Sequence, residues 1–130
     1  MELKCRVFVG RSPGKGRGVF AAEDIPCGAE IMRGSVMTIS EDEFALIDST
    51  LIGDYPFRWS HHDSAIGHAI ALGYISLVNH AFACNARIRM DRDADVAVLW
   101  AINNIRRGEE ITFPYRGGPG EHEPLWFDAV

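Results

Sequence analysis

The chain has 130 residues and a formal net charge of −5, which fits one compact domain and argues against a broad nucleic-acid-binding surface. Hydrophobic residues make up 47% of the chain and charged residues 24%, proportions that argue against wholesale disorder. No apolar run approaches the ~20 residues of a membrane-spanning helix, and the first residues lack the layout of a signal peptide. We therefore expect a soluble, intracellular protein with a cationic partner.

Glycine and cysteine are the informative residue types. The chain contains 13 glycines, above the typical share of ~7%, so many backbone positions need unusual conformations. The three cysteines are widely spaced, which predicts free thiols rather than disulfides or a zinc knuckle. The histidines have no metal-binding spacing, and we expect no metal site.

The N-terminal part of the chain is typical of short strands separated by glycine turns. Residues 5–9 alternate apolar and basic side chains, and residues 19–22 are again extended. Between them, residues 12–18 contain three glycines, which predicts a flexible turn. A third apolar stretch covers residues 30–39. This pattern predicts β structure.

A helix is predicted next. Ser40 and Glu43 have the spacing of a capping box, in which each side chain bonds to the backbone of the other residue. Apolar residues then recur at helical spacing. The pattern predicts a short helix over about 41–52, closed by Gly53.

The second half of the chain contains one strong strand signal. Residues 65–72 are weakly patterned and fit a short helix or an edge strand. Residues 96–102 form the strongest candidate for a buried strand. The tail from Gly117 is too rich in glycine for a regular element, but Trp126 and Phe127 should not stay in water. We expect the tail to fold back onto the body.

Three patches of sequence carry the functional argument, and each alone is weak evidence. Gly14–Ala21 fits a β-turn, Leu77–Ala86 contains the polar pair Asn79 and His80, and Gly108–Tyr115 contains adjacent glutamates. The first lacks the G-x-G-x-x-G register and the G-K-[ST] ending of phosphate-binding loops, which disfavours nucleotide-phosphate binding of those kinds. Together, and in this order, the three resemble the motifs of SET-domain protein-lysine methyltransferases. The resemblance covers residues 5–116.

This resemblance implies a mostly β protein with the SET-domain β-clip fold, which has several small sheets, a short helical insert and a pseudoknot near the C-terminus. A single domain would span 1–130, with a core at 5–116, an insert at about 41–72 and a tail at 117–130. The cysteine-rich zinc modules of larger family members are missing. The chain is thus similar to the minimal stand-alone SET proteins of viruses and bacteria.

Three residues depart from the family pattern. Ala81 stands where serine is usual, Cys84 where proline is usual, and Pro114 where aspartate is common. These departures keep a second hypothesis open, a SET-fold binding module that has weak turnover or none. A third reading is a related β-clip domain without a cofactor.

The resemblance implies S-adenosylmethionine as methyl donor and S-adenosylhomocysteine as product. The residues expected to wrap the methionine end of the cofactor are Lys15, Gly16, Arg17 and Gly18. Asn79 and His80 would hold the cofactor at its adenine edge, and Trp126 resembles the part of the tail that covers it.

Tyr115 is the predicted catalytic residue, because its hydroxyl would orient the reacting amine and methyl group. Phe113 lies two positions earlier, on the same side of an extended strand. In the family, phenylalanine at this position goes with room for more than one methyl group. Three aromatic residues are candidates for the wall of the lysine channel, with plain core packing as the alternative for each: Tyr55, Trp59 and Tyr74.

The expected partner is a protein or peptide with a lysine in a basic segment, such as a histone tail, which negative surface would attract. No direct contact with nucleic acid or membrane is expected. A homodimer is a further expectation, because a chain of this size can need the extra burial. The expected location is the cytoplasm, or a host nucleus for a viral protein or an effector.

Overall fold

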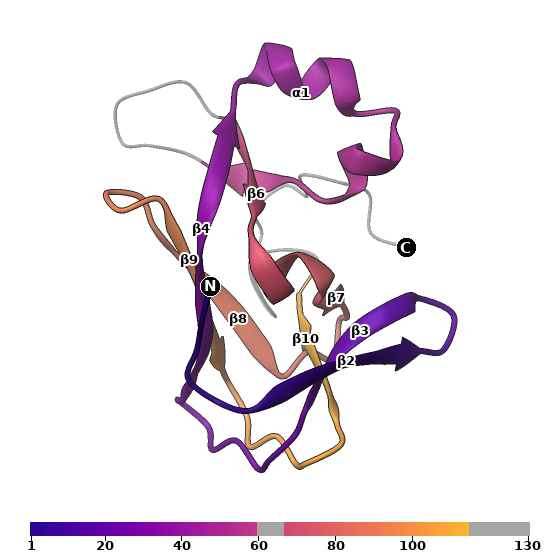
Figure 1. Ribbon diagram of the computed structural model, residues 1–130, viewed down its shortest axis with the longest axis vertical. Helices are drawn as coiled ribbons and strands as arrows, with labels where there is room; N and C mark the ends of the chain where they lie inside the picture. The colour runs from indigo at the N-terminus through magenta and orange to yellow at the C-terminus, as the bar shows by residue number, and fades with distance from the viewer. Residues whose placement is uncertain (60–66, 115–130) are drawn as a thin grey trace.

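The computed structural model describes residues 1–59 and 67–114, which form two β-sheets with short helices at their edges (Figure 1). Within these residues, the larger sheet has six strands in the order β5-β6-β4-β9-β8, with β1 paired to β4. The smaller sheet has four, in the order β2-β3-β10-β7. The elements are β1 (Glu2–Leu3), β2 (Val7–Ser12), β3 (Gly16–Ala21), β4 (Glu30–Ile39), α1 (Glu41–Ile47), the 3-10 helix η1 (Leu51–Asp54), β5 (Phe57–Trp59), β6 (Gly67–Ala71), the 3-10 helix η2 (Gly73–Leu77), β7 (Asn79–His80), β8 (Ala86–Asp91), β9 (Val96–Ala101) and β10 (Glu110–Phe113). The predicted mostly β fold is confirmed.

The β2–β3 hairpin shows that the predicted glycine turn over 12–18 was too long. Antiparallel pairing continues to Arg11 with Arg17 and Ser12 with Gly16. The reversal needs only residues 13–15, where Gly14 has φ +75°, and β3 then begins at Gly16, which has φ +79°. Because glycine adopts positive φ at little cost, the chain turns tightly and the strands extend into the glycine-rich segment.

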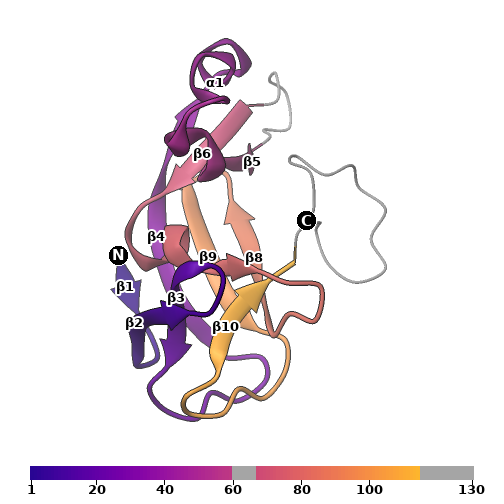
Figure 2. The same cartoon turned by 90° about the vertical axis from the view of Figure 1, so that its right-hand side faces the viewer.

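The predicted buried strand over 96–102 is confirmed as β9, which lies between β4 and β8. Its side chains alternate: Ala97, Leu99 and Ala101 are buried in the main hydrophobic core. Val98 and Trp100 therefore lie on the opposite, outer face of the sheet. The core takes side chains from both sheets, namely from β4, β6 and β9 of the larger one and from β3 and β10 of the smaller one. Figure 2 shows the backbone of these strands.

The capping box predicted at Ser40 and Glu43 is confirmed, since each side chain bonds to the backbone N–H of the other residue. The helix, however, ends at Ile47 rather than at residue 52. The Thr50 hydroxyl donates to the Ile47 carbonyl at 2.6 Å and competes with a further helical turn. Gly53 lies within η1, where a Cβ would collide with that same carbonyl.

The weakly patterned segment that begins near residue 65 contains a strand, β6. It pairs with both β4 and β5, so the strand is internal and the expected edge position was wrong. No helix within residues 1–59 and 67–114 is long and apolar enough to cross a membrane. The tail over 117–130, with its expected return to the body, lies outside the described residues.

Candidate active site

The three sequence motifs meet on the smaller sheet, although up to about ninety residues separate them. β10 pairs antiparallel with β3, which brings Glu110 opposite Phe20. On its other edge β10 pairs parallel with β7, which places Thr112 beside Asn79 and Phe113 beside His80. Figure 1 shows β3, β7 and β10 gathered in one region of the molecule.

The Glu110 carboxylate joins these strands. Its Oε2 accepts a hydrogen bond from Asn79 Nδ2 at 2.7 Å, and its Oε1 accepts one from Ser12 Oγ at 2.9 Å. Asn79 Nδ2 also donates to the Arg17 carbonyl at 2.9 Å, which ties β7 to the glycine hairpin. A Cβ at Gly18 would collide with the carboxylate and lie 2.9 Å from Asn79 Nδ2. The close approach of strand, amide and carboxylate thus requires glycine at position 18.

Asn85 holds the segment after β7 against β10. Its Nδ2 donates to the Glu110 carbonyl at 2.8 Å, and its Oδ1 accepts the Thr112 N–H at 2.9 Å. The Ala81 N–H donates to the Phe113 carbonyl at 3.0 Å. Burial raises the pKa of the nearby Cys84 thiol, so this residue stays neutral. These bonds therefore link the Asn79–Asn85 motif to β10, although Ala81 and Cys84 differ from the family pattern.

The imidazole of His80 faces apolar groups in this site. Burial is the main reason why its pKa falls from the usual 6.5 to about 4, and the Lys15 charge lowers it further. A backbone hydrogen bond with Pro114 acts in the opposite direction. The imidazole packs on the Phe113 ring, with 4.1 Å between the ring centroids. His80 is accordingly neutral near pH 7.

The structure brings most of the predicted cofactor residues together. Lys15 Nζ donates to the His80 carbonyl at 3.2 Å, and the Asn79 amide bonds to Arg17 as described. The predicted residues within this cluster are Lys15, Gly16, Arg17, Gly18, Asn79, His80 and Phe113.

The predicted channel residues are more scattered. Tyr74 lies in η2, just before β7, and packs against the main core. Tyr55 is 39% exposed and follows η1, which packs on α1 away from the β2–β3 hairpin (Figure 1). Trp59 ends β5, and Tyr115 and Trp126 lie outside the described residues. The roles of all five stay predictions.

Three residues of the network were not predicted as site residues: Ser12, Asn85 and Glu110. Asn85 and Glu110 lie inside the motifs that resemble the family, so these motifs could have identified them as site residues. Ser12 is only 2% exposed and its contact spans 98 positions of sequence, and nothing local marks it.

The residues fit S-adenosylmethionine, which carries an ammonium and a carboxylate at its methionine end. Asn79 uses its amide nitrogen on Arg17 and Glu110, while its Oδ1 accepts no hydrogen bond within the described residues and suits an N–H donor of the ligand. Lys15 and Arg17 are exposed cations that can bind a carboxylate. A neutral His80 adds no repulsion toward a sulfonium.

Fold and site together define a β domain in which a glycine hairpin, an Asn-His strand and a Glu-bearing strand meet at one carboxylate. The family model described as "SET domain" matches residues 16–116, and the chain belongs to this family. The free state of Cys5, Cys27 and Cys84 agrees with the prediction from their spacing.

Two proteins named as histone-lysine N-methyltransferases are similar to this chain in sequence. The "Histone-lysine N-methyltransferase, H3 lysine-37 specific" of Schizosaccharomyces pombe is 30% identical over 115 residues, which cover 88% of this chain and 71% of that protein. The "Histone-lysine N-methyltransferase trr" of Drosophila melanogaster is 28% identical over 127 residues, 88% of this chain but only 5% of the relative. The chain thus corresponds to a small part of some relatives.

Solved structures support the same fold. A humanized mutant of the Chaetomium thermophilum Polycomb Repressive Complex 2, bound to the inhibitor GSK126, matches with a TM-score of 0.71 and 25% identity, over 89% of this chain and 16% of that one. The complex from the same fungus in an autoinhibited conformation, bound to S-adenosylmethionine, matches with a TM-score of 0.69 and 24% identity, again over 89% and 16%.

Proposed function

We propose that this protein transfers a methyl group from S-adenosylmethionine to a lysine side chain of a histone or a similar basic protein segment. The observation that carries the proposal is the network in which Glu110 holds Asn79 against the Arg17 carbonyl, at the place where the three SET motifs meet. The relatives named as histone-lysine N-methyltransferases support the substrate class. The net charge of −5 suits a basic substrate.

The cofactor supplies an activated methyl group on a sulfonium. In the transfer, the substrate ammonium would first lose a proton to water, and the C–N bond to the lysine would form as the C–S bond breaks and S-adenosylhomocysteine leaves. Most of the protein's contribution is to align the groups and exclude water. Lys15 and Arg17 would fix the methionine end. Asn79 would hold the cofactor at its adenine edge, and Gly18 keeps the backbone close enough for the Asn79 amide to bond to the Arg17 carbonyl.

Tyr115 is the proposed catalytic residue, two positions after Phe113, and its hydroxyl would orient the reacting amine. We propose that the phenylalanine at 113 allows addition of more than one methyl group, because it has no hydroxyl to hold a water in that space. The Phe113 ring lies against His80, which supports a position beside the cofactor residues. Mass spectrometry of the product at completion should find di- or trimethyl-lysine; monomethyl-lysine alone would contradict this part.

The deciding experiment has two stages. Calorimetry should detect binding of S-adenosylhomocysteine, and labelled methyl groups should then pass from S-adenosylmethionine to mixed core histones. Tyr115→Phe should retain the affinity for S-adenosylhomocysteine but lower the transfer rate about a hundredfold or more, because it removes only the orienting hydroxyl.

The alternatives predict different results. A SET-fold binding module would bind S-adenosylhomocysteine without transfer, and a β-clip domain without a cofactor would not bind it. We further propose that the protein acts inside the cell, in the cytoplasm or, for a viral protein or an effector, in a host nucleus. Sedimentation of the purified chain would test the expected homodimer.

A further inference from the structure

The negative charge of the chain is concentrated in one segment, residues 34–57. This segment contains five of the 18 acidic residues and none of the 13 lysines and arginines. The rest of the chain therefore carries 13 acidic and 13 basic residues, so this segment alone accounts for the net charge of −5. The segment runs from β4 through α1 and η1 to the start of β5. A basic ligand would be attracted to this part of the molecule before any other.

The same segment presents apolar side chains to solvent. Phe44 stacks on the His68 ring of β6, with 3.8 Å between the ring centroids, so this side of α1 faces the larger sheet. Leu46 follows two positions later, about 200° around the helix, and lies on the outer side. The 3-10 helix η1, which packs against α1, begins with Leu51 and Ile52. Among the side chains that the structure describes, Leu46 and Leu51 are the most exposed large apolar ones, and a group of exposed apolar residues marks an interaction site.

Two exposed carboxylates accompany these apolar side chains. Asp42 is four positions before Leu46, so the two residues are neighbours on the outer side of α1. Asp48 is the C-cap of α1, where a negative charge is unfavourable and where the last turn has no basic residue. Within residues 1–59 and 67–114, neither aspartate side chain makes a hydrogen bond or an ion pair. The other carboxylates of α1 are engaged, Glu41 at 3.8 Å from a histidine nitrogen and Glu43 in the capping box.

We propose that this surface, the α1–η1 patch of Asp42, Leu46, Asp48, Leu51 and Ile52, binds a basic amphipathic segment of the substrate protein, away from the lysine that is methylated. Lysine or arginine side chains of that segment would pair with the two aspartates, and its apolar side chains would cover the two leucines and Ile52. The proposal rests on the proposed function in one respect, namely that the substrate is a basic protein.

The α1–η1 patch lies apart from the methyl-transfer site. Figure 1 shows α1 at one end of the molecule and the β2–β3 hairpin toward the other end. A segment on the patch therefore leaves the cofactor residues free. Its effect would be to hold the substrate on the protein and raise the effective concentration of the reacting lysine, which lowers KM without changing the chemical step.

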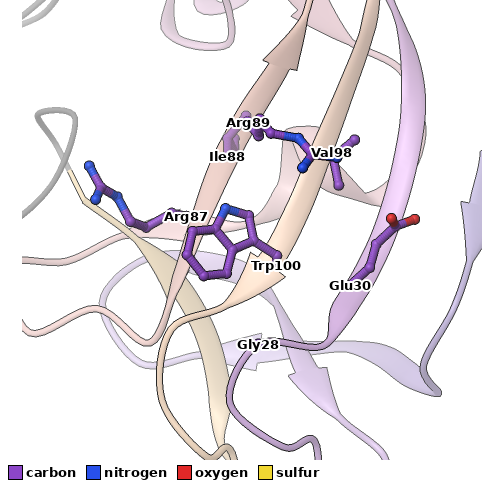
Figure 3. Close-up of a pocket in the computed structure, with 7 residues that line it drawn as sticks. All are labelled: Gly28, Glu30, Arg87, Ile88, Arg89, Val98 and Trp100. Atoms are coloured by element: carbon purple, nitrogen blue, oxygen red, sulfur yellow. The ribbon is translucent and has the colours of Figure 1, made fainter.

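Two alternatives fit the charges less well. A symmetric contact between two copies through this surface would bring the aspartates of both patches together, and like charges disfavour that arrangement. A pocket of about 490 Å³ opens on the outer face of the larger sheet, but Arg87 and Arg89 are among the residues that line it, which disfavours a basic segment there (Figure 3).

Steady-state methyl transfer to mixed core histones, and to a short lysine peptide from a histone tail, tests the proposal. The double variant Leu46→Gln with Leu51→Gln should raise KM for core histones about tenfold and keep kcat within about twofold, because docking precedes the chemical step. The double variant Asp42→Asn with Asp48→Asn should raise the same KM about threefold and weaken its dependence on salt. KM for the short peptide should not change, because that peptide lacks the docking segment.

Leu3→Gln and Asp93→Asn are the matched controls, because each changes an exposed side chain of the same kind outside the α1–η1 patch, and both KM values should stay the same. Anisotropy of labelled core histones without cofactor measures docking separately from transfer. If the patch variants weaken this binding but the native sequence transfers no methyl group, docking holds and the proposed function fails. Docking is overturned if histone binding and KM do not change, or if KM rises equally for histones and peptide. Self-association that the leucine variant abolishes would overturn it in favour of a second copy.

Discussion

Two regions of this molecule differ in how far their side chains are buried. One is the Glu110 network, formed by Ser12, Asn79, Asn85 and Glu110, and the other is the α1–η1 segment. Around Glu110, the Ser12 side chain of β2 and the Asn79 side chain of β7 donate to the carboxylate at 2.9 and 2.7 Å, and both contacts are partly buried. In the α1–η1 segment no residue of α1 is buried, and Leu46, Leu51 and Ile52 are 80%, 76% and 56% exposed. Both regions lie in one small domain, but the second is held chiefly by local contacts such as the capping box of Ser40 and Glu43, and by the stacking of Phe44 on His68.

The difference indicates where this sequence tolerates change. A buried network in which each donor has an acceptor fails when one member is lost, because the remaining polar group has no partner. An exposed helix held by its own capping box loses little when a surface side chain changes. The substitutions below test this contrast, from the largest expected effect to the smallest.

Gly18→Ala should have the largest effect. The new Cβ would collide with the Glu110 carboxylate and crowd Asn79, so the strands must separate. We expect a loss of about 2 kcal/mol, or about thirtyfold, in binding of S-adenosylhomocysteine by calorimetry.

Gly14→Ala is the matched control. Gly14 also lies in the hairpin, with φ +75°, but an added Cβ would meet nothing within 4 Å. This variant should lose stability by about 1 kcal/mol from backbone strain and keep most of its affinity. Equal loss of affinity in both variants would show that hairpin strain, not the contact with Glu110, matters.

Glu110→Gln should have the next largest effect. Glutamine has one acceptor oxygen where the carboxylate has two. It can keep that oxygen toward Asn79 only if its NH2 group turns to Ser12, which must then accept, and either orientation loses the charge of the carboxylate that strengthens both bonds. We expect about 1–3 kcal/mol of destabilisation and about tenfold weaker binding of S-adenosylhomocysteine.

The adjacent Glu109→Gln provides the control. Among residues 1–59 and 67–114, the Glu109 carboxylate accepts only the Arg106 N–H, through Oε1, in the turn before β10. A glutamine oxygen can accept the same bond, and affinity should stay within about twofold of the native sequence. If the two variants weaken binding equally, the network does not position Asn79.

The comparison also explains which features could be predicted from sequence. The capping box at Ser40 and the buried strand β9 depend on residues close in sequence, and both were correct. The three motifs predicted which segments would meet, because their order and spacing matched one family. Ser12 could not be predicted, since its contact with Glu110 exists only after β2 and β10 are brought together. The helix end at Ile47 depended on a Thr50 side-chain bond that helical periodicity does not detect.

A fall in pH should change the stability of the folded state by an amount between the effects of Glu110→Gln and Leu51→Gln. The pKa of His80 is lowered to about 4 in the folded state, chiefly by burial, whereas an unfolded chain should show the usual 6.5. The unfolded state therefore binds more protons between these values, and the folded state loses stability as pH falls from 6.5 toward 4.

Denaturant unfolding at a series of pH values, on the native sequence and on His80→Gln, measures this contribution. The difference between the two stabilities should be constant above pH 7 and should change in favour of His80→Gln as pH falls to 4. A difference that does not vary with pH would mean that His80 is not neutral and buried in solution.

Leu51→Gln should have the smallest effect. The Leu51 side chain is 76% exposed, so its replacement removes little apolar surface from the folded core, and the free energy of unfolding should change by no more than about 0.5 kcal/mol. Ile111→Ala, at a site with 0% exposure beside Glu110, should cost about 2–5 kcal/mol in the same denaturant titration. A large loss at Leu51 would show that the α1–η1 segment is covered in solution, by another copy or another part of the protein, and that its exposed leucines contribute to stability there.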